Sequence, residues 1–322
     1  MVAVKEYEPI SALIDKLSHR KMHLEDRAFA EQWLHNVGYY RLSAYWYPYR
    51  ELLREEPPIR GDNFRPGTTF EDIAALYEFD RKLRTLVHDG IERIEIGLRT
   101  QLNEYLGAVG GALAYQDPAH FRPHFDHTAW IQIASKRVTR AQKDNPAIRH
   151  HKDHYGGQIP IWVLSEVLDF SDVSRLYEGL FTTAQYQIAE NLGINIDLTE
   201  LTNNQRRKAK KYHPLVRWFE HLTIIRNTSA HHARLWNRSF TPVSTTGLRT
   251  MSEFTTLPDT QNEQVYGALC VMNVLLRKLS PKTSWPAKVR ELIEGSFTKL
   301  DLRDPAELGC PDGWQKDPIW NK

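Results

Sequence analysis

Cysteine is scarce in this sequence: only Cys270 and Cys310 occur among 322 residues. Two distant cysteines exclude a disulfide framework and a Cys-x-x-Cys metal motif, and they fit a reducing compartment such as the cytoplasm. No stretch approaches the roughly 20 apolar residues of a membrane-spanning helix, and the first residues lack the apolar core of a secretory signal. We therefore expect a cytoplasmic protein without a membrane partner.

An excess of either sign of charge is also missing, because 42 Lys and Arg residues face 40 Asp and Glu residues, for a formal net charge of +2. This balance excludes a protein that binds polyanions through its overall charge, although it allows a local basic site. Hydrophobic residues make up 41% and charged residues 25%, as in globular chains. The length fits one large domain or two ordinary ones.

Strand-like alternation and internal repeats are absent, and the apolar residues recur at helical spacing instead. The longest helical segment spans 70–106, either as one helix or as a pair with weak points at Gly90 and Gly97, and Thr68 or Thr69 can cap it. We predict an all-α fold. Its expected parts are an N-terminal helical region with an aromatic motif over 1–66, a helical core over 67–242, and a C-terminal helical region with a tail over 243–322. The other predicted helices span 9–20, 24–38, 39–54, 128–142, 161–180, 183–191, 214–238, 261–279 and 286–296.

The segment 226-RNTSAHHARLWNR-238 has neither Lys nor Glu, yet it holds three arginines, two histidines and two asparagines. If the helix that starts at Pro214 continues through it, every strongly polar residue except His232 lies on one face. The apolar residues, Trp236 among them, lie on the other face, which is expected to be buried. The polar face is made of Arg226, Asn227, His231, Arg234, Asn237 and Arg238.

These residue types suit the cleavage of an RNA phosphodiester bond. His231 can accept the proton of the 2′-hydroxyl group or protonate the leaving 5′-oxygen. Arg226 can stabilise the charge that develops on the phosphorane oxygens. Asn227 lies four residues before His231 and is expected to contact the imidazole and fix its orientation. This route requires no metal ion.

The Arg-x4-His spacing by itself is a weak signal. Two other pairs have the same spacing, one in a proline-containing loop and one in a polar stretch that ends in Gly-Gly. Only Arg226 and His231 lie on a strongly amphipathic predicted helix. The other two pairs are Arg122 with His127 and Arg149 with His154.

The remaining polar residues of the segment each have two interpretations. His232 is either a partly buried residue near the core or a dimer contact, or a catalytic group. Arg234 and Arg238 either bind RNA phosphates or form ion pairs at the helix end. Asn237 either supports the site or caps the helix C-terminus.

Three other features allow a functional and a structural interpretation. The basic run 206-RRKAKK-211 is either an RNA track or a solvated helix surface. The aromatic residues of 39–49 either stack on bases or pack in the core. The charged residues of segment 70–106 are expected to pair with one another, and Glu95 or Arg99 is a candidate for supporting the site.

The run 224-IIRNTSAHHARLWNR-238 resembles the signature of the Abi-like proteins, the AbiD/AbiF group of bacterial abortive-infection factors, which belong to the HEPN superfamily. The superfamily motif is an arginine, a polar residue, three variable residues and a histidine, and here it corresponds to Arg226, Asn227 and His231. The resemblance covers roughly residues 8–240, with one departure at Ser171, where the family has glycine after phenylalanine. The other similar blocks are 36–50, 76–100 and 160–180.

The resemblance implies a HEPN-type helical bundle that cleaves RNA without a metal ion or another cofactor. It also implies a homodimer, since HEPN ribonucleases usually assemble one composite site from two motifs and this chain has one well-placed motif. Two alternatives remain: a non-catalytic RNA-binding protein that holds a small non-coding RNA, and the toxin component of a toxin–antitoxin pair. The intact motif favours an endoribonuclease of phage defence.

Overall fold

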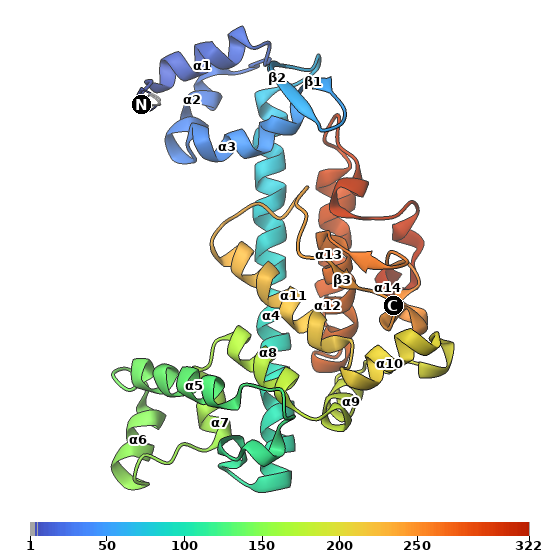
Figure 1. Cartoon of the computed structure of the whole chain (residues 1–322). Helices are drawn as coiled ribbons and strands as arrows, with labels where there is room; N and C mark the ends of the chain where they lie inside the picture. Colours follow the sequence, from blue (N-terminus) through green and yellow to red (C-terminus); the bar gives the residue numbers. More distant parts are fainter. Residues whose placement is uncertain (1–3, 5, 322) are drawn as a thin grey trace. The chain divides into compact units, whose positions relative to one another are not determined.

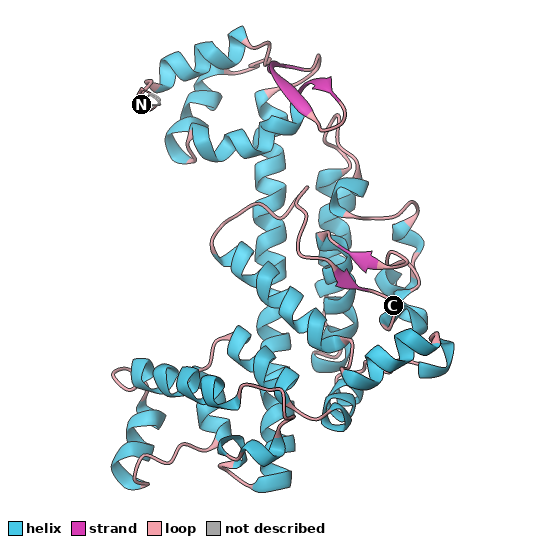
Figure 2. Cartoon of the chain, viewed as in Figure 1, coloured by secondary structure: helices cyan, strands magenta, loops and turns pink. Residues whose placement is uncertain are grey.

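Helices dominate the computed structural model, which describes residue 4 and residues 6–321 (Figure 2). The predicted all-α class is confirmed, since the only additions in this part of the chain are two small antiparallel sheets of two strands each. Among the described residues, no helix combines the length and the apolar character that crossing a membrane requires.

The first sheet corrects a prediction. The sequence predicted a helical stretch over 39–54, broken near Pro48, and then a loop, whereas strand β1 (Arg50–Arg54) pairs with β2 (Ile59–Phe64). Pro48 ends the preceding helix because its ring cannot fit a helix interior. Three of the five β1 residues are exposed, Leu53 among them at 67%. The hairpin therefore has no continuous buried face, and no alternation of apolar and polar residues reveals it in the sequence.

The chain forms two compact units, and each combines distant parts of the sequence. Two of the boundaries fall inside helices, namely α4 (Phe70–Gly110) and α13 (Trp285–Leu292). The three-part organisation expected from the sequence stays a prediction. The first unit comprises residues 1–85 and 288–307, and the second comprises residues 86–287 and 308–322.

The first unit has an aromatic core. Phe79 of α4 lies 4.7 Å from Phe297 between ring centroids, and the guanidinium of Arg303 lies 4.1 Å from the centre of the Tyr49 ring. Such contacts bury large apolar surfaces and give the pairs defined geometries. The elements are α1 (Ile10–His19), α2 (Arg27–Asn36), α3 (Tyr39–Trp46), the hairpin, the first turns of α4, the end of α13 and a π-helical turn at Ile293–Phe297.

A buried polar network joins α3 to α4 within this unit. The hydroxyl of Tyr45 donates to Asp80 Oδ2 at 2.7 Å, and Arg84 Nη1 donates to the Tyr45 oxygen at 3.1 Å. Arg84 also pairs with Asp80 one helical turn away. Burial and the Asp80 carboxylate raise the pKa of Tyr45 above its ordinary value, so the phenol stays protonated and remains a donor.

The second unit holds most of the helices (Figure 1). They include the long helix predicted over 70–106, which is one helix and continues to Gly110. The second unit's elements are the rest of α4, α5 (His127–Ala141), α6 (Pro146–His154), α7 (Ile161–Leu164), α8 (Phe170–Gly179), α9 (Thr182–Asn191), α10 (Asn203–Lys211), α11 (Leu215–Ala230), β3 (Val243–Ser244), β4 (Gln261–Asn262), α12 (Val265–Leu279), the start of α13 and α14 (Pro318–Asn321).

Gly90 and Gly97 of α4 are packing positions and do not interrupt the helix. A Cβ atom on Gly90 would lie 2.5 Å from the end of Met272, and one on Gly97 would lie 2.4 Å from Leu279. These distances are too short for real Cβ contacts, so side chains of α12 rest directly against the α4 backbone. The glycines that the sequence suggests as weak points are thus where α4 and α12 approach each other.

Helix α11 carries the candidate motif, and its apolar face is fully buried. Trp218, Phe219, Leu222 and Ile225 are each 0% exposed. Phe219 meets Tyr177 of α8 edge to face at 5.3 Å, and the Trp218 indole donates to the carbonyl of Ser244 in β3 at 3.1 Å. Burial of four such side chains stabilises the helix position by roughly 6 kcal/mol or more.

Two buried histidines lie just before this helix and within it. His213 Nδ1 accepts from the backbone N–H of Leu215 at 3.1 Å. The backbone N–H of His213 donates to Gln185 Oε1 at 3.0 Å. Burial lowers the pKa of His213 to about 3. Burial likewise lowers the pKa of His221, in the middle of α11, to about 4. Both imidazoles are therefore neutral in the folded protein at neutral pH.

We predict that Arg84→Met lowers the free energy of unfolding by about 3 kcal/mol, because it leaves the Asp80 carboxylate buried without its cation. Urea denaturation of the variant and the unchanged chain measures the difference. Arg81→Met is the matched control, since Arg81 forms an exposed pair with Glu78 at 2.8 Å, and it should cost less than about 1 kcal/mol. Equal losses in the two variants would contradict the prediction.

We also predict that stability falls as the pH drops below 6.5. An unfolded imidazole takes up a proton near pH 6.5, whereas folded His213 and His221 resist protonation until about pH 3 and 4. Each histidine thus removes up to about 1.4 kcal/mol per pH unit over the window from 6.5 toward 4. Urea denaturation at pH 7, 5.5 and 4.5 tests this, and His213→Asn should show a shallower loss. An unchanged slope in that variant would refute the assignment.

Candidate active site

The helix that carries the motif ends earlier than the sequence predicted. Helix α11 stops at Ala230, and the predicted continuation through Arg238 is wrong. The His232 N–H donates to the Ser229 carbonyl at 2.9 Å, and the Ala233 N–H donates to the Thr228 carbonyl at 3.0 Å. This pair of bonds is the Schellman motif, which closes a helix with one residue in the left-handed conformation.

His232 is that residue, with φ at 56°. Glycine usually takes this position because it has no Cβ atom, so the sequence contains no conventional stop signal here. Histidine is among the side chains that tolerate the left-handed region better than most. The reversal lets Leu235 and Trp236 reach the interior, where both are 0% exposed. Their burial was expected, but a turn and not a helix brings it about.

The last turn of α11 keeps the three motif residues together. Arg226 is half-buried, while Asn227 and His231 are exposed. Arg226 Nη1 donates to Asn227 Oδ1 at 3.3 Å. The Asn227 carbonyl accepts from the His231 N–H at 3.0 Å. Asn227 therefore contacts the arginine through its side chain and the histidine through its backbone, whereas the sequence suggested a side-chain contact with the imidazole.

The other polar residues of the segment lie beyond the helix. Arg234 Nη2 donates to the Asn237 carbonyl at 3.1 Å, and its guanidinium lies 5.1 Å from the centre of the Trp236 ring. Arg238 lies 5.5 Å from the centre of the Phe240 ring. Asn237 has φ at 46° and lies in the loop, so its proposed role as the helix cap is wrong. The single polar face drawn from the sequence thus splits into a helix end and a following loop.

Two carboxylates from other elements lie in electrostatic reach of Arg226. They are Glu95 of α4 and Asp169, which precedes α8. Glu95 was expected from the sequence as a supporting residue. Asp169 was missed, although the spacing of Asp169 and Asp172 matches the capping box that starts α8. That signal identifies a helix start, and nothing in it points to a distant arginine.

Each carboxylate is already paired with another arginine. Glu95 pairs with Arg99 on the same helix, and both side chains are 14% exposed. Asp169 pairs with Arg137 at 2.7 Å and with Arg140 at 2.9 Å. Among the described residues, no carboxylate forms an ion pair with Arg226. Arg226 therefore interacts with the two acids at longer range while its charge stays available.

The pKa values of the two acids shift in opposite directions. Burial raises the pKa of Glu95, and this effect exceeds the lowering by Arg99 and Arg226. Burial also raises the pKa of Asp169, but its bond to Arg140 and the charges of Arg137, Arg140 and Arg226 together lower it below its ordinary value. Asp169 is therefore ionised at neutral pH and fixes the negative side of the cluster.

Three further hydrogen bonds hold this cluster in place. Arg99 Nη2 donates to the Leu168 carbonyl at 2.8 Å, directly before Asp169. Asn103 Nδ2 donates to Ser165 Oγ at 3.0 Å. Arg137 Nε donates to Asp172 Oδ2 at 2.7 Å. Helices α4, α5 and α8 are thus tied together next to the end of α11. In the described residues, no group of three His, Cys, Asp or Glu side chains is arranged to hold a metal ion.

The residues that build this site lie within a region that matches a known protein family. The profile of the Abi-like protein family matches residues 32–237, which is more than half of the chain. The chain belongs to the Abi-like family. Membership supports a role in abortive infection, the defence of bacteria against phage. Neither the comparison with curated proteins nor the comparison with solved structures gave a match.

The Abi-like match includes Arg226, Asn227, His231 and the turn at His232. It ends one residue before Arg238 and leaves out residues 238–322, which include α12. The helix that presses against the α4 glycines therefore lies outside the matched region.

We predict that His232→Gly is more stable than His232→Ala by about 1 kcal/mol, because both remove the imidazole but only alanine strains the left-handed backbone. Chemical denaturation of the two variants measures the difference. The comparison cancels any contact of the lost ring. A more stable alanine variant would mean that the helix continues through residue 232.

Proposed function

We propose that this Abi-like protein is a metal-independent endoribonuclease of the HEPN type that acts in abortive infection. The observation that carries the proposal is the last turn of α11, where Arg226, Asn227 and His231 follow one another on one helix end. Cleavage by an RNA 2′-hydroxyl group needs a permanent cation and an imidazole, and this helix end carries both side chains. The sequence resemblance points to these residues, and the Abi-like match spans them.

The proposed chemistry assigns a function to each of the three side chains. His231 accepts the 2′-hydroxyl proton as the oxygen attacks the adjacent phosphorus, or it protonates the departing 5′-oxygen. Arg226 donates to the phosphorane oxygens as their negative charge grows. Asn227 accepts from Arg226 and holds its guanidinium. The products are a 2′,3′-cyclic phosphate and a free 5′-hydroxyl, and no metal ion takes part.

The charge arrangement around Arg226 supports this role. Glu95 and Asp169 attract its guanidinium, but their short ion pairs go to Arg99, Arg137 and Arg140. The acids therefore position Arg226 without neutralising it. A phosphate group can then compete for its donors without breaking a short ion pair.

We propose that two copies of the chain form the complete site. One imidazole cannot serve as base and acid in the same step, and a two-fold axis would bring two histidines together. His231 is exposed at the end of α11, where a second copy can reach it. RNA is the substrate, and the homodimer and the cytoplasm are parts of the same proposal.

The test is cleavage of a mixed RNA pool in EDTA by the full chain. We expect the unchanged protein to cut and to leave cyclic-phosphate ends, and His231→Ala and Arg226→Ala to be slower by about 100-fold or more. Arg217→Ala and His154→Ala are matched controls, since Arg217 lies at the other end of α11 and pairs with Glu220 at 2.7 Å, and His154 is exposed on α6. Equal cutting by all variants would reject this site.

Two further readouts separate the alternatives. RNA that copurifies with the chain and is never cut would favour the non-catalytic binding protein. For the composite site, His231→Ala protein is added in excess to unchanged protein, with time for subunit exchange. Activity per unchanged chain should fall, because mixed dimers lack one imidazole. Constant activity would mean that each chain has a complete site.

A further inference from the structure

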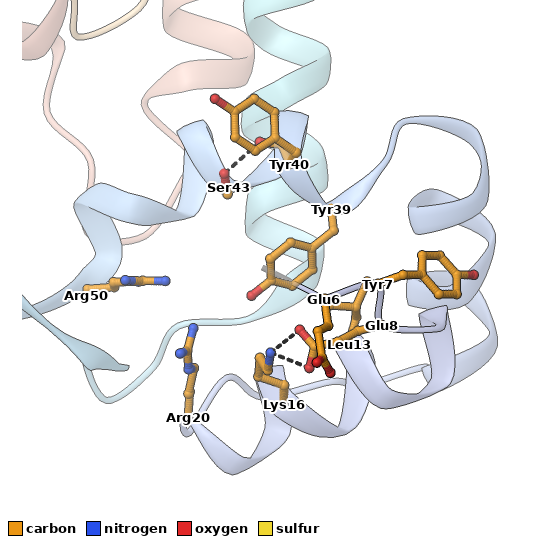
Figure 3. Close-up of a pocket in the computed structure, with 10 residues that line it drawn as sticks. All are labelled: Glu6, Tyr7, Glu8, Leu13, Lys16, Arg20, Tyr39, Tyr40, Ser43 and Arg50. Atoms are coloured by element: carbon orange, nitrogen blue, oxygen red, sulfur yellow. Dashed lines mark hydrogen bonds and ion pairs between the residues drawn. The ribbon is translucent and has the colours of Figure 1, made fainter. Parts of the chain in front are cut away.

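The first unit contains a pocket that plays no part in the proposed cleavage chemistry (Figure 3). Its volume is about 880 Å³, within the range of roughly 300–1,000 Å³ for small-molecule sites. Its walls come from the segment before α1, from α1 itself, from α3 and from β1. The residues used below are Tyr7, Lys16, Arg20, Tyr39, Tyr40 and Arg50.

Two arginines of this pocket converge on one carboxylate. Arg20 Nη2 and Arg50 Nη1 each lie 3.2 Å from an oxygen of Asp62. The two arginine side chains are mostly buried, at 23% and 17% exposed, whereas the Asp62 side chain is 67% exposed. The cations are therefore fixed by the fold, while the carboxylate between them is solvated. A phosphate group carries more charge and more acceptor oxygens than Asp62 and matches the same pair of donor forks.

Three tyrosines line the same pocket as these cations. Figure 3 shows Tyr39 in the centre of the view, with Arg20 and Arg50 on one side and Tyr7 on the other. Tyr39 is half-buried and lies edge-on against buried Trp46 at 4.8 Å, which fixes its ring. Tyr40 is 91% exposed and Tyr7 is 89% exposed. Their exposed rings are available as stacking surfaces for a planar ligand.

We propose that this pocket binds a nucleoside phosphate, with the phosphate on Arg20 and Arg50 and the base on the tyrosine rings. The ligand is either a nucleotide within an RNA strand or a free nucleotide, because both present the same phosphate and base. A bare phosphate would leave the rings unused. The neighbouring Lys16 is already paired with Glu8. The phosphate therefore takes the place of the solvated Asp62 carboxylate on Arg20 and Arg50.

The aromatic residues of 39–49 fall into two groups with different roles. Tyr45, Trp46 and Tyr49 are buried and belong to the core, as the structural interpretation expected. Tyr39 and Tyr40 face the pocket. One short helix thus supplies both core contacts and ring surfaces.

The test is calorimetric titration of the full chain with AMP, GMP, CMP and UMP, with ribose 5-phosphate and inorganic phosphate as probes that lack the base. We expect the nucleotides to bind more tightly than either probe. Arg20→Ala and Arg50→Ala should each raise the Kd by about tenfold or more. Tyr40→Leu should raise it by about fivefold or more. This last variant keeps the test valid if an arginine variant fails to fold, because Tyr40 is almost fully exposed.

Matched controls lie outside the pocket. Arg27→Ala removes a charge from α2 that pairs with Asp15 at 2.7 Å, and Tyr155→Leu removes an exposed ring from the second unit. Both should leave the Kd unchanged. Ribose 5-phosphate that binds as tightly as the nucleotides, equal losses in the controls, or no nucleotide binding would overturn the proposal.

A nine-nucleotide RNA titrated into His231→Ala protein identifies the source of the ligand. Binding at least tenfold tighter than that of the mononucleotides, and weakened by Arg20→Ala, assigns the pocket to an RNA strand. Binding of mononucleotides without the oligonucleotide assigns it to a free nucleotide. Because the mononucleotide titration involves no cleavage, it can succeed or fail independently of the ribonuclease proposal.

Discussion

The position at which α11 ends determines the geometry of the candidate site. The left-handed backbone at His232 sends the chain back after one residue, and the bonds from His232 and Ala233 close the helix behind His231. As a result, His231 lies at the last turn and is exposed. Had the helix continued, His231 would be an interior helix position with further turns packed beyond it. The strained residue next to the proposed acid–base group thus determines how it is presented.

The rest of the second unit holds that helix end in position. On its apolar face α11 buries Trp218, Phe219 and further side chains against neighbouring elements. At its start, His213 links the Leu215 N–H to Gln185, a residue of α9. The second anchor depends on a neutral imidazole, because a protonated His213 would lose the acceptor that Leu215 uses. Apolar contacts and a neutral histidine therefore fix the helix, while Arg217 and Glu220 near its start form an exposed ion pair with each other.

Much of this arrangement could be predicted from the sequence, because helical periodicity reflects which faces are buried. The long helix α4, the motif on α11 and the burial of Trp236 all followed from it. The end of α11 did not, since histidine occupies the position where glycine would have signalled a stop. The β1–β2 hairpin was missed because its exposed residues show no alternation. Asp169 was missed because its partners come from helices far away in the sequence, and spacing cannot reveal such neighbours.

The arginines of the site are alike in type but differ in the partners that they bind. Arg99, Arg137 and Arg140 form short ion pairs with Glu95 and Asp169, so they serve to join helices. Arg226 is held by the same acids only at longer range and by one bond to Asn227. An arginine that the fold positions without pairing keeps donors for an incoming phosphate. Among the described residues, Arg226 differs from the neighbouring arginines because no carboxylate forms a short ion pair with it. This difference is independent of the family motif, which points to the same residue.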